Sequence, residues 1–404
     1  MSKSLRILYA AGPGNIIGTY GYWRKGEDDP SQVAITYSSQ FYDACRDLQA
    51  EGYVISSCEE KEYLQDGNYI LEHRPNPLRN ASGLLYHLGH IWYGLRLIAT
   101  AIAWRAKVAI VADGTTHWFV LSLLSFLGVQ VVPSLHCTPK RKFGSPGKLD
   151  KLLSTLNRHF FAKSCTAIMS ISDEIDKQLA NITGGKTKSI VQFKPTYRHT
   201  EFATVKQPDG EHSRFRVLFA GRIEADKGVF DLVEIAKRFA ALGRNDITFD
   251  ICGTGSVLDA LREQVKLAGV DSAFTFHGYC NKLKMHERFS EAHAVIVPTK
   301  TNFVEGFNKV VAEGVLSSRP VITSAVCPAL SHMDGTLVEV PPDDVTAYGD
   351  ALLKLCDDRE LYEQKRQYPQ HLVNQFYDLS NGWAAALESI VTPQDKNVPS
   401  EKTL

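Results

Sequence analysis

Two glutamates eight positions apart, Glu305 and Glu313, suggest the most specific chemistry in this sequence. The residues between them are typical of a loop that enters a helix. If the whole segment were helical, eight residues would rise about 12 Å, roughly the span from the sugar to the ribose of a nucleotide sugar. The free N–H groups of a helix N-terminus between the carboxylates could bind a diphosphate. One carboxylate at each hydroxyl-rich end, with an anion site in the middle, predicts a nucleotide-sugar pocket.

Two cations earlier in the sequence fit the same ligand. Arg222 and Lys227 follow the apolar segment 216–220, and each has a glycine neighbour, Gly221 or Gly228. An order of strand, turn and helix places both side chains at the carboxyl edge of a sheet, near a helix N-terminus. A guanidinium and an ammonium there could neutralise a departing diphosphate, as a magnesium ion does in many other enzymes. Taken alone, either cation would be interpreted as a solvated surface charge. The flanking glycines and the downstream glutamates favour phosphate binding.

Four further candidates lie at the ends of predicted strands. Gly253 could let the backbone approach a ligand, or could simply form a turn. Tyr279 could hold a nucleobase or be a packed aromatic residue. His136 follows a strongly apolar strand and should emerge at the carboxyl edge of the sheet, which favours a functional role. Gly14 follows the first strand, but the third glycine of the dinucleotide fingerprint is missing, which argues against a nicotinamide cofactor.

The elements that must position these residues form an alternating pattern. Short apolar segments alternate with helical segments along the chain, which indicates parallel sheets with helices on both faces. We predict two doubly wound domains, residues 1–194 and 215–376, joined by a polar, aperiodic linker at 195–214. Ligands of such sheets bind outside the carboxyl ends of the strands, so the site should lie in the cleft between the domains. Residues 364–391 have a helical pattern, and 392–404 are predicted to be a disordered tail.

Composition sets limits on function. The chain has 404 residues, of which 44% are hydrophobic and 22% charged, as in soluble globular proteins. Its 45 basic and 45 acidic residues balance, so nucleic acid is not an expected partner. None of the eight cysteines has CxxC spacing, which favours reduced thiols in the cytoplasm and makes a zinc site improbable.

Two segments raise the question of membrane contact. The stretch 84–106 is the most apolar, but Arg96 interrupts it, and its apolar positions recur at intervals of three and four. We therefore expect a helix docked on a sheet, with a helix lying on a membrane surface as the alternative. The segment from Lys140 to Lys163 is basic and aromatic. It could bind an anionic membrane surface or a phosphate-bearing acceptor, or be an ordinary solvated face. A peripheral place on the inner face of the membrane is the corresponding expectation for localisation.

A set of spaced motifs in the second half resembles the retaining glycosyltransferases of family 4, also called glycosyl transferases group 1, which have the GT-B fold. The first half, notably 109–138 and 162–173, is a looser match. The matching motifs are Phe219-Ala-Gly-Arg-Ile223, Asp226-Lys-Gly228, Cys252-Gly-Thr-Gly255, Phe276-His-Gly278, Ala294-Val-Ile-Val-Pro298, the segment Glu305 to Glu313, Ser318-Arg-Pro-Val-Ile322 and Val338-Glu-Val-Pro-Pro342.

The resemblance implies a role for each candidate. Arg222 and Lys227 would hold the diphosphate of a UDP- or GDP-sugar, and Glu313 would bind the ribose. Glu305 would face the donor sugar, and His136 would lie against it. The remaining implied binding positions are Gly14, Gly221, Gly253, Tyr279, Gly306, Phe307, Asn308 and Lys309.

The resemblance also implies metal-independent transfer that keeps the anomeric configuration, to a glycan or lipid-linked acceptor in polysaccharide or glycolipid assembly. The helix at 377–391 would cross back to the first domain. The polar stretch 19–31 departs from the family pattern, so acceptor identity cannot be carried over. Two alternatives remain open: a GT-B epimerase or phosphorylase, and a non-catalytic nucleotide-sugar-binding protein. The cations and carboxylates together disfavour a non-catalytic role.

Overall fold

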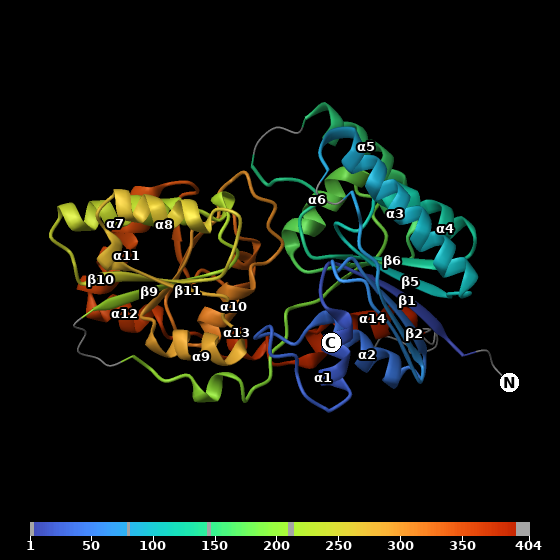
Figure 1. Ribbon diagram of the computed structural model, residues 1–404, viewed down its shortest axis with the longest axis horizontal. Coiled ribbons are helices and arrows are strands. Elements are labelled where there is room, and N and C mark those ends of the chain that lie inside the picture. Colours follow the sequence, from blue (N-terminus) through green and yellow to red (C-terminus); the bar gives the residue numbers. More distant parts are fainter. Residues whose placement is uncertain (1–3, 79–80, 144–146, 209–213, 393–404) are drawn as a thin grey trace, which may run out of the picture.

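A computed structural model describes residues 4–78, 81–143, 147–208 and 214–392. The chain forms two α/β domains side by side, each with helices on both faces of a central sheet (Figure 1). The two doubly wound domains predicted from the alternating pattern are thereby confirmed.

The N-terminal sheet has eight strands in the order β3-β4-β2-β1-β5-β6-β7-β8. All neighbours pair in parallel except β3 and β4. Its central strands are apolar throughout because helices cover both faces. The strands are β1 (Arg6–Ala11), β2 (Glu51–Ser56), β3 (Tyr63–Asp66), β4 (Tyr69–His73), β5 (Val108–Ala112), β6 (Gln130–Leu135), β7 (Ile168–Ser170) and β8 (Ile190–Gln192). The helices are α1 (Ile16–Trp23), α2 (Tyr37–Asp47), α3 (Gly83–Ala103), the 3₁₀ turn η1 (Trp118–Leu121), α4 (Ser122–Phe126), α5 (Lys148–His159) and α6 (Asp173–Thr183).

The C-terminal sheet has six parallel strands in the order β11-β10-β9-β12-β13-β14. The strands are β9 (Phe215–Ala220), β10 (Ile247–Cys252), β11 (Phe274–Gly278), β12 (Ala294–Val297), β13 (Val321–Ser324) and β14 (Val338–Val340). The helices are α7 (Val229–Ala241), α8 (Leu258–Leu267), α9 (Lys282–Glu291), α10 (Lys309–Leu316), α11 (Val345–Asp357), α12 (Arg359–Lys365), α13 (Gln370–Asn374) and α14 (Trp383–Val391).

The sequence analysis missed one pair of strands, and one expectation about secondary structure is wrong. The β3–β4 hairpin was not predicted, because its strands are short and carry polar residues, as edge strands often do. The single helix expected at 364–391 is interrupted twice. Pro369 precedes α13, and Gly382 is the N-cap of α14, with extended backbone at both positions. A proline cannot donate the backbone hydrogen bond that a continuing helix requires.

The last helix belongs spatially to the first domain. Although α14 follows the C-terminal sheet in sequence, it packs against α2 (Figure 1). Trp383 is fully buried there, with its ring centroid 5.1 Å from that of Tyr9 in β1. The Trp383 backbone N–H donates to Oε1 of Gln40 in α2. The chain thus crosses between the domains twice.

The orientation of α3 corrects another expectation. Of the six apolar positions expected to face the sheet, Ile98 is buried and Ile91 packs against the core, but Leu84, Leu88, Leu95 and Ile102 are exposed. The helix instead buries a face that includes small residues. No helix among the described residues has the length and apolar character needed to cross a membrane.

Candidate functional site

A pocket of about 210 Å³ lies at the carboxyl ends of β9 and β12, where two strands next to each other in the C-terminal sheet feed their following loops. It contains both predicted cations and the first predicted glutamate. The lining residues are Phe219, Ala220, Gly221, Arg222, Lys227, Ile296, Val297, Thr299, Glu305, Asn308, Lys309 and Val310. Gly221, Arg222, Lys227, Glu305, Asn308 and Lys309 were all candidates from the sequence, so strand-end reasoning located this pocket.

An ion pair spans the pocket. Nζ of Lys227 donates to Oε2 of Glu305 at 2.6 Å, and both side chains are largely buried. Nδ2 of Asn308 donates to the same carboxylate oxygen at 3.3 Å. The pair places an ammonium and a carboxylate next to each other in the pocket. A ligand with an anionic group beside hydroxyl groups could bind to both of them.

An aromatic ring supports the two cations, and the sequence analysis did not identify it. The Lys227 ammonium lies 3.8 Å from the ring centroid of Phe303, and the Arg222 guanidinium carbon lies 5.8 Å from it. Cations above an aromatic face are attracted by its quadrupole. Phe303 therefore helps to keep two like charges close together. An aromatic residue in the short loop between β12 and Glu305 was the available signal.

The loop before α10 brings the two domains into contact. A Cβ atom placed on Gly306 would lie only 1.7 Å from the carbonyl oxygen of His136, at the end of β6. The helix begins at Lys309, and Asn308 at its N-cap has φ of 69°. The helix thus starts inside the segment from Glu305 to Glu313, as expected, and the rise of about 12 Å for a fully helical segment does not apply. The physical reason is the left-handed residue Asn308, which turns the chain sharply before the helix.

His136 is held by a chain of hydrogen bonds from the last helix. The indole N–H of Trp383 donates to Oγ of Ser134 at 2.8 Å, and Oγ lies 2.9 Å from Nε2 of His136. Burial lowers the pKa of His136 to about 3, with Lys309 nearby adding to the effect. Nδ1 is buried without a hydrogen-bond partner. The ring is therefore neutral at physiological pH and lies beside the Gly306 contact.

Asp113 fixes the turn that carries His136. Its Oδ2 accepts the backbone N–H groups of His136 at 3.0 Å and Cys137 at 2.6 Å. Burial raises the pKa of Asp113 to about 7, although these two hydrogen bonds oppose the shift. The sequence analysis missed this residue. An acidic side chain directly after the apolar strand β5 was the signal.

Glu313 lies outside the 210 Å³ pocket, one turn into α10. It is only 8% exposed and accepts a hydrogen bond from the hydroxyl of Tyr197 at 3.3 Å. Burial raises the pKa of Glu313 to about 7, and the ammonium of Lys309 partly offsets this. Nζ of Lys309 reaches Oε1 of Gln32 in the N-terminal domain at 2.9 Å and lies over the ring of Tyr37. The loop after α1, which contains Gln32, therefore covers the end of the site near Lys309 and Glu313.

The titration of Glu313 gives a test of its predicted contact with ribose. An ionised carboxylate accepts hydroxyl hydrogen bonds more strongly than a protonated one. Affinity for UDP should therefore fall as the pH drops through about 7, by up to about tenfold per pH unit. Calorimetry across this range should show a flatter profile for Glu313→Gln, since phosphate titration is common to both proteins. Parallel profiles would show that Glu313 does not contact the nucleotide.

The other candidates lie around these groups. Tyr279 donates from its hydroxyl to the carbonyl oxygen of Ser31 at 2.8 Å and lines a separate pocket of about 320 Å³ with α1. Gly253 packs behind Gly221, because a Cβ there would lie 1.8 Å from the Gly221 carbonyl oxygen. The carbonyl oxygen of Gly14 accepts from Ser56 in the turn after β1. The Phe307 side chain is buried near Phe376, so only its backbone can serve a ligand.

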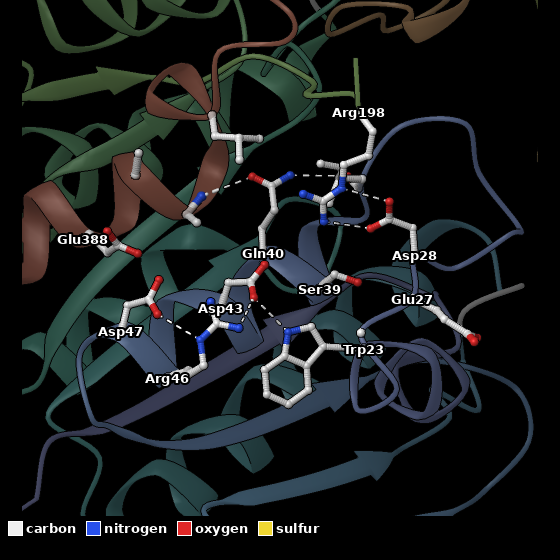
Figure 2. A pocket seen from close by; sticks show the side chains of 15 residues that line it. Trp23, Glu27, Asp28, Ser39, Gln40, Asp43, Arg46, Asp47, Arg198 and Glu388 are labelled. Atoms are coloured by element: carbon white, nitrogen blue, oxygen red, sulfur yellow. Dashed lines mark hydrogen bonds and ion pairs between the residues drawn. The ribbon is translucent and has the colours of Figure 1, made fainter. Parts of the chain in front are cut away.

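A larger cavity of about 450 Å³ contains none of the predicted residues (Figure 2). It lies between α2, α14 and the loop after α1. Its two arginines are already paired, Arg46 with Asp43 and Asp47, and Arg198 with Asp28. Five carboxylates line this cavity beside its two arginines, whereas the strand-end pocket has three cations and one carboxylate, so the strand-end pocket is the better candidate for binding an anionic ligand.

Comparison with known proteins agrees with this geometry. The family described as glycosyl transferases group 1 matches residues 214–358, which carry both pocket cations and both glutamates. Over these residues the chain is similar to the group 1 glycosyltransferases. Among curated relatives of this chain, the alpha-D-kanosaminyltransferase of Streptomyces kanamyceticus is 29% identical over 282 residues, which cover 66% of this chain and 72% of that protein.

Solved structures share the complete two-domain fold with this chain. An alpha,alpha-trehalose-phosphate synthase (UDP-forming) from Burkholderia vietnamiensis has a TM-score of 0.71 at 14% identity, covering 96% of this chain and 98% of that one. Anabaena HepE in complex with UDP and glucose has a TM-score of 0.64 at 13% identity, covering 95% and 97%. At these identities the likeness establishes the fold, and the GT-B architecture expected from the resemblance is confirmed.

Proposed function

We propose that this chain is a glycosyltransferase that moves a sugar from a nucleoside-diphosphate donor, a UDP- or GDP-sugar, to a glycan or lipid-linked acceptor, with retention of the anomeric configuration. The observation that carries the proposal is the Lys227–Glu305 pair in the strand-end pocket, with Arg222 beside it. The Anabaena HepE structure, similar in fold, contains UDP and glucose, which supports a nucleotide-sugar donor. Work in polysaccharide or glycolipid assembly at the inner face of the membrane is part of the proposal.

Each group has a step to perform. Lys227 and Arg222 would bind the diphosphate and stabilise the charge that grows on it as the sugar–phosphate bond breaks. Glu305 would then accept hydrogen bonds from hydroxyls of the donor sugar. Nδ1 of His136, which lacks a partner, would form a hydrogen bond with the same sugar from the N-terminal domain. Closure of the domains at Gly306 brings these groups together and excludes water.

The reaction itself is tested with a panel of nucleotide sugars and acceptors. The proposal expects release of nucleoside diphosphate that depends on an acceptor, and a product whose anomeric proton has the configuration of the donor by NMR. An epimerase would convert the donor without releasing the nucleotide. A phosphorylase would need inorganic phosphate. A binding protein would bind the donor and leave it unchanged.

Metal independence gives a second test. In the described part of the chain, no group of three or more His, Cys, Asp and Glu side chains is arranged to hold a metal ion. If Lys227 and Arg222 take the role of a cation on the diphosphate, transfer rates should be the same with and without EDTA. A rate that falls in EDTA and returns with added magnesium would contradict this assignment.

A further inference from the structure

The outward face of α3 is mostly apolar, with Arg96 as its charged residue. Leu84 is 74% exposed and Trp92 60%, and Leu88, Leu95 and Ile102 extend the same face. The opposite face packs closely through small residues. A Cβ on Gly94 would lie 2.2 Å from Oγ1 of Thr116, and one on Gly89 would lie 2.6 Å from Cβ of Leu78. The glycines therefore allow close packing on the inward side of α3, which also buries Tyr93, Leu97 and Ile98, while the large side chains of the outward side stay in solvent.

Neighbouring helices extend this surface. The turn η1 contacts α3, α4 and α5, and these helices form one layer of the N-terminal domain (Figure 1). Phe126 at the end of α4 is 87% exposed. Of the nineteen large apolar side chains exposed in the described ranges, twelve belong to this layer. We call them the apolar face; they are Leu84, Leu85, Leu88, Trp92, Leu95, Ile102, Leu123, Phe126, Leu127, Leu149, Leu152 and Leu156. Such a concentration marks an interaction surface.

Charge identifies the partner. The sequence from 81 to 172, which contains the apolar face, has ten Lys and Arg residues but only two Asp and no Glu, in a chain with zero formal net charge. One of those two, Asp113, accepts hydrogen bonds from backbone N–H groups inside the domain. On the other side of the sheet, the cavity of Figure 2 is lined by Glu27, Asp28, Asp43, Asp47 and Glu388. The domain is thus basic on its apolar side and acidic on the other.

We propose that the apolar face docks on the surface of an anionic lipid bilayer. Its leucines and aromatic rings would enter the boundary between head groups and acyl chains, and the basic residues around them would meet lipid phosphates. A second copy of this chain fits less well, because a two-fold contact would bring one strongly basic surface against another. The surface includes α3, which extends the basic segment 140–163 considered from the sequence.

Docking in this orientation would present the acceptor side of the enzyme to the membrane. A pocket of about 210 Å³ lies at the ends of β5 and β6, between α3 and α5. Tyr86, His90 and His117 line it together with Lys140 and Asn157. Leu85 and Leu88 of the apolar face are adjacent in sequence to Tyr86 and His87 on α3. That this pocket binds the head group of a membrane lipid rests on the proposed function. Docking of the apolar face on the membrane does not rest on it.

Vesicle binding by the full chain tests docking separately from activity. The wild type should sediment with phosphatidylglycerol-containing vesicles, less as salt increases, and weakly with pure phosphatidylcholine. The triple variant Trp92→Ser, Phe126→Ser, Leu152→Ser changes one exposed residue on each helix. Its partitioning should fall by roughly 100- to 1000-fold, since each of the three inserted side chains contributes about tenfold when fully buried.

The matched control changes exposed leucines in the C-terminal domain. Leu242→Ser, Leu267→Ser, Leu283→Ser removes side chains that are 56%, 79% and 68% exposed, and should bind vesicles like the wild type. Brominated lipids should quench tryptophan fluorescence in the wild type and much less in Trp92→Phe. Equal sedimentation of the two triple variants would overturn the proposal. A second outcome would also overturn it: the wild type does not bind anionic vesicles, but light scattering shows a dimer. In that case the triple variant Trp92→Ser, Phe126→Ser, Leu152→Ser would be monomeric.

Discussion

Replacing Lys227 with alanine should lower kcat by about 100- to 1000-fold, the usual cost of removing one preorganised group from a developing negative charge. Lys227 contacts Glu305 at 2.6 Å and the ring of Phe303, so it is held in place before the donor arrives. Most of its effect should appear in kcat, because the charge on the diphosphate grows only as the bond to the sugar breaks. Arg222→Ala should have a smaller effect in the same direction. Steady-state kinetics with the preferred donor would measure both.

A suitable control for Lys227 lies in α7, the helix that follows it. Lys237 forms a 2.9 Å ion pair with Glu234, and both side chains are well exposed. Exposed pairs of this kind contribute little to stability. Lys237→Ala should therefore leave kcat unchanged. If Lys227→Ala behaved like Lys237→Ala, with a wild-type rate, Lys227 would be an ordinary structural ion-pair partner.

Gly306→Ala should reduce kcat/KM by about 100-fold or more, since a displacement of about 1 Å at a reacting centre can have that effect. The added methyl group would meet the backbone carbonyl of His136 at 1.7 Å. A backbone atom of the opposite domain cannot rotate away as a side chain can. The domains would therefore have to separate at this point, which moves the pocket cations away from His136.

The two domains should each remain folded in Gly306→Ala, so its melting temperature should change little. Small-angle scattering in the presence of UDP should give a larger radius of gyration than for the wild type. Gly21→Ala is the control, because Gly21 lies in α1 with no atom within 4 Å of a new Cβ. Full activity of Gly306→Ala would show that the contact between the domains is unnecessary for catalysis.

Much of the donor pocket was predictable because parallel sheets put ligands at the carboxyl ends of strands. Arg222, Lys227 and Glu305 each follow such a strand, and the structure brings them into one pocket. Their roles stay predictions. Phe303 and Asp113 were missed because their importance depends on partners that only the folded chain brings close. For Trp383 and Ser134, the hydrogen-bonded partners are 249 positions apart.

The error about α3 has a different origin. Periodicity shows that a helix has an apolar stripe, but it does not show which way the stripe faces. In this helix, close packing through Gly89 and Gly94 determined which face turns inward. Burial of the largest apolar side chains would have favoured the opposite orientation. Similarly, the spacing between Glu305 and Glu313 could not reveal that the helix begins only after Asn308.

The burial of Trp383 against Tyr9 has a consequence for how the chain is made. The first strand and the helix α14 share one core, although more than 370 residues separate these two rings in the sequence. During synthesis, the N-terminal half leaves the ribosome long before the tryptophan that fills its interior. It cannot reach its final packing until α14 has been translated. Cleavage between residues 195 and 208 would therefore not release two complete halves. The first fragment would have a tryptophan-sized cavity, and the second would expose the side chain that belongs in it.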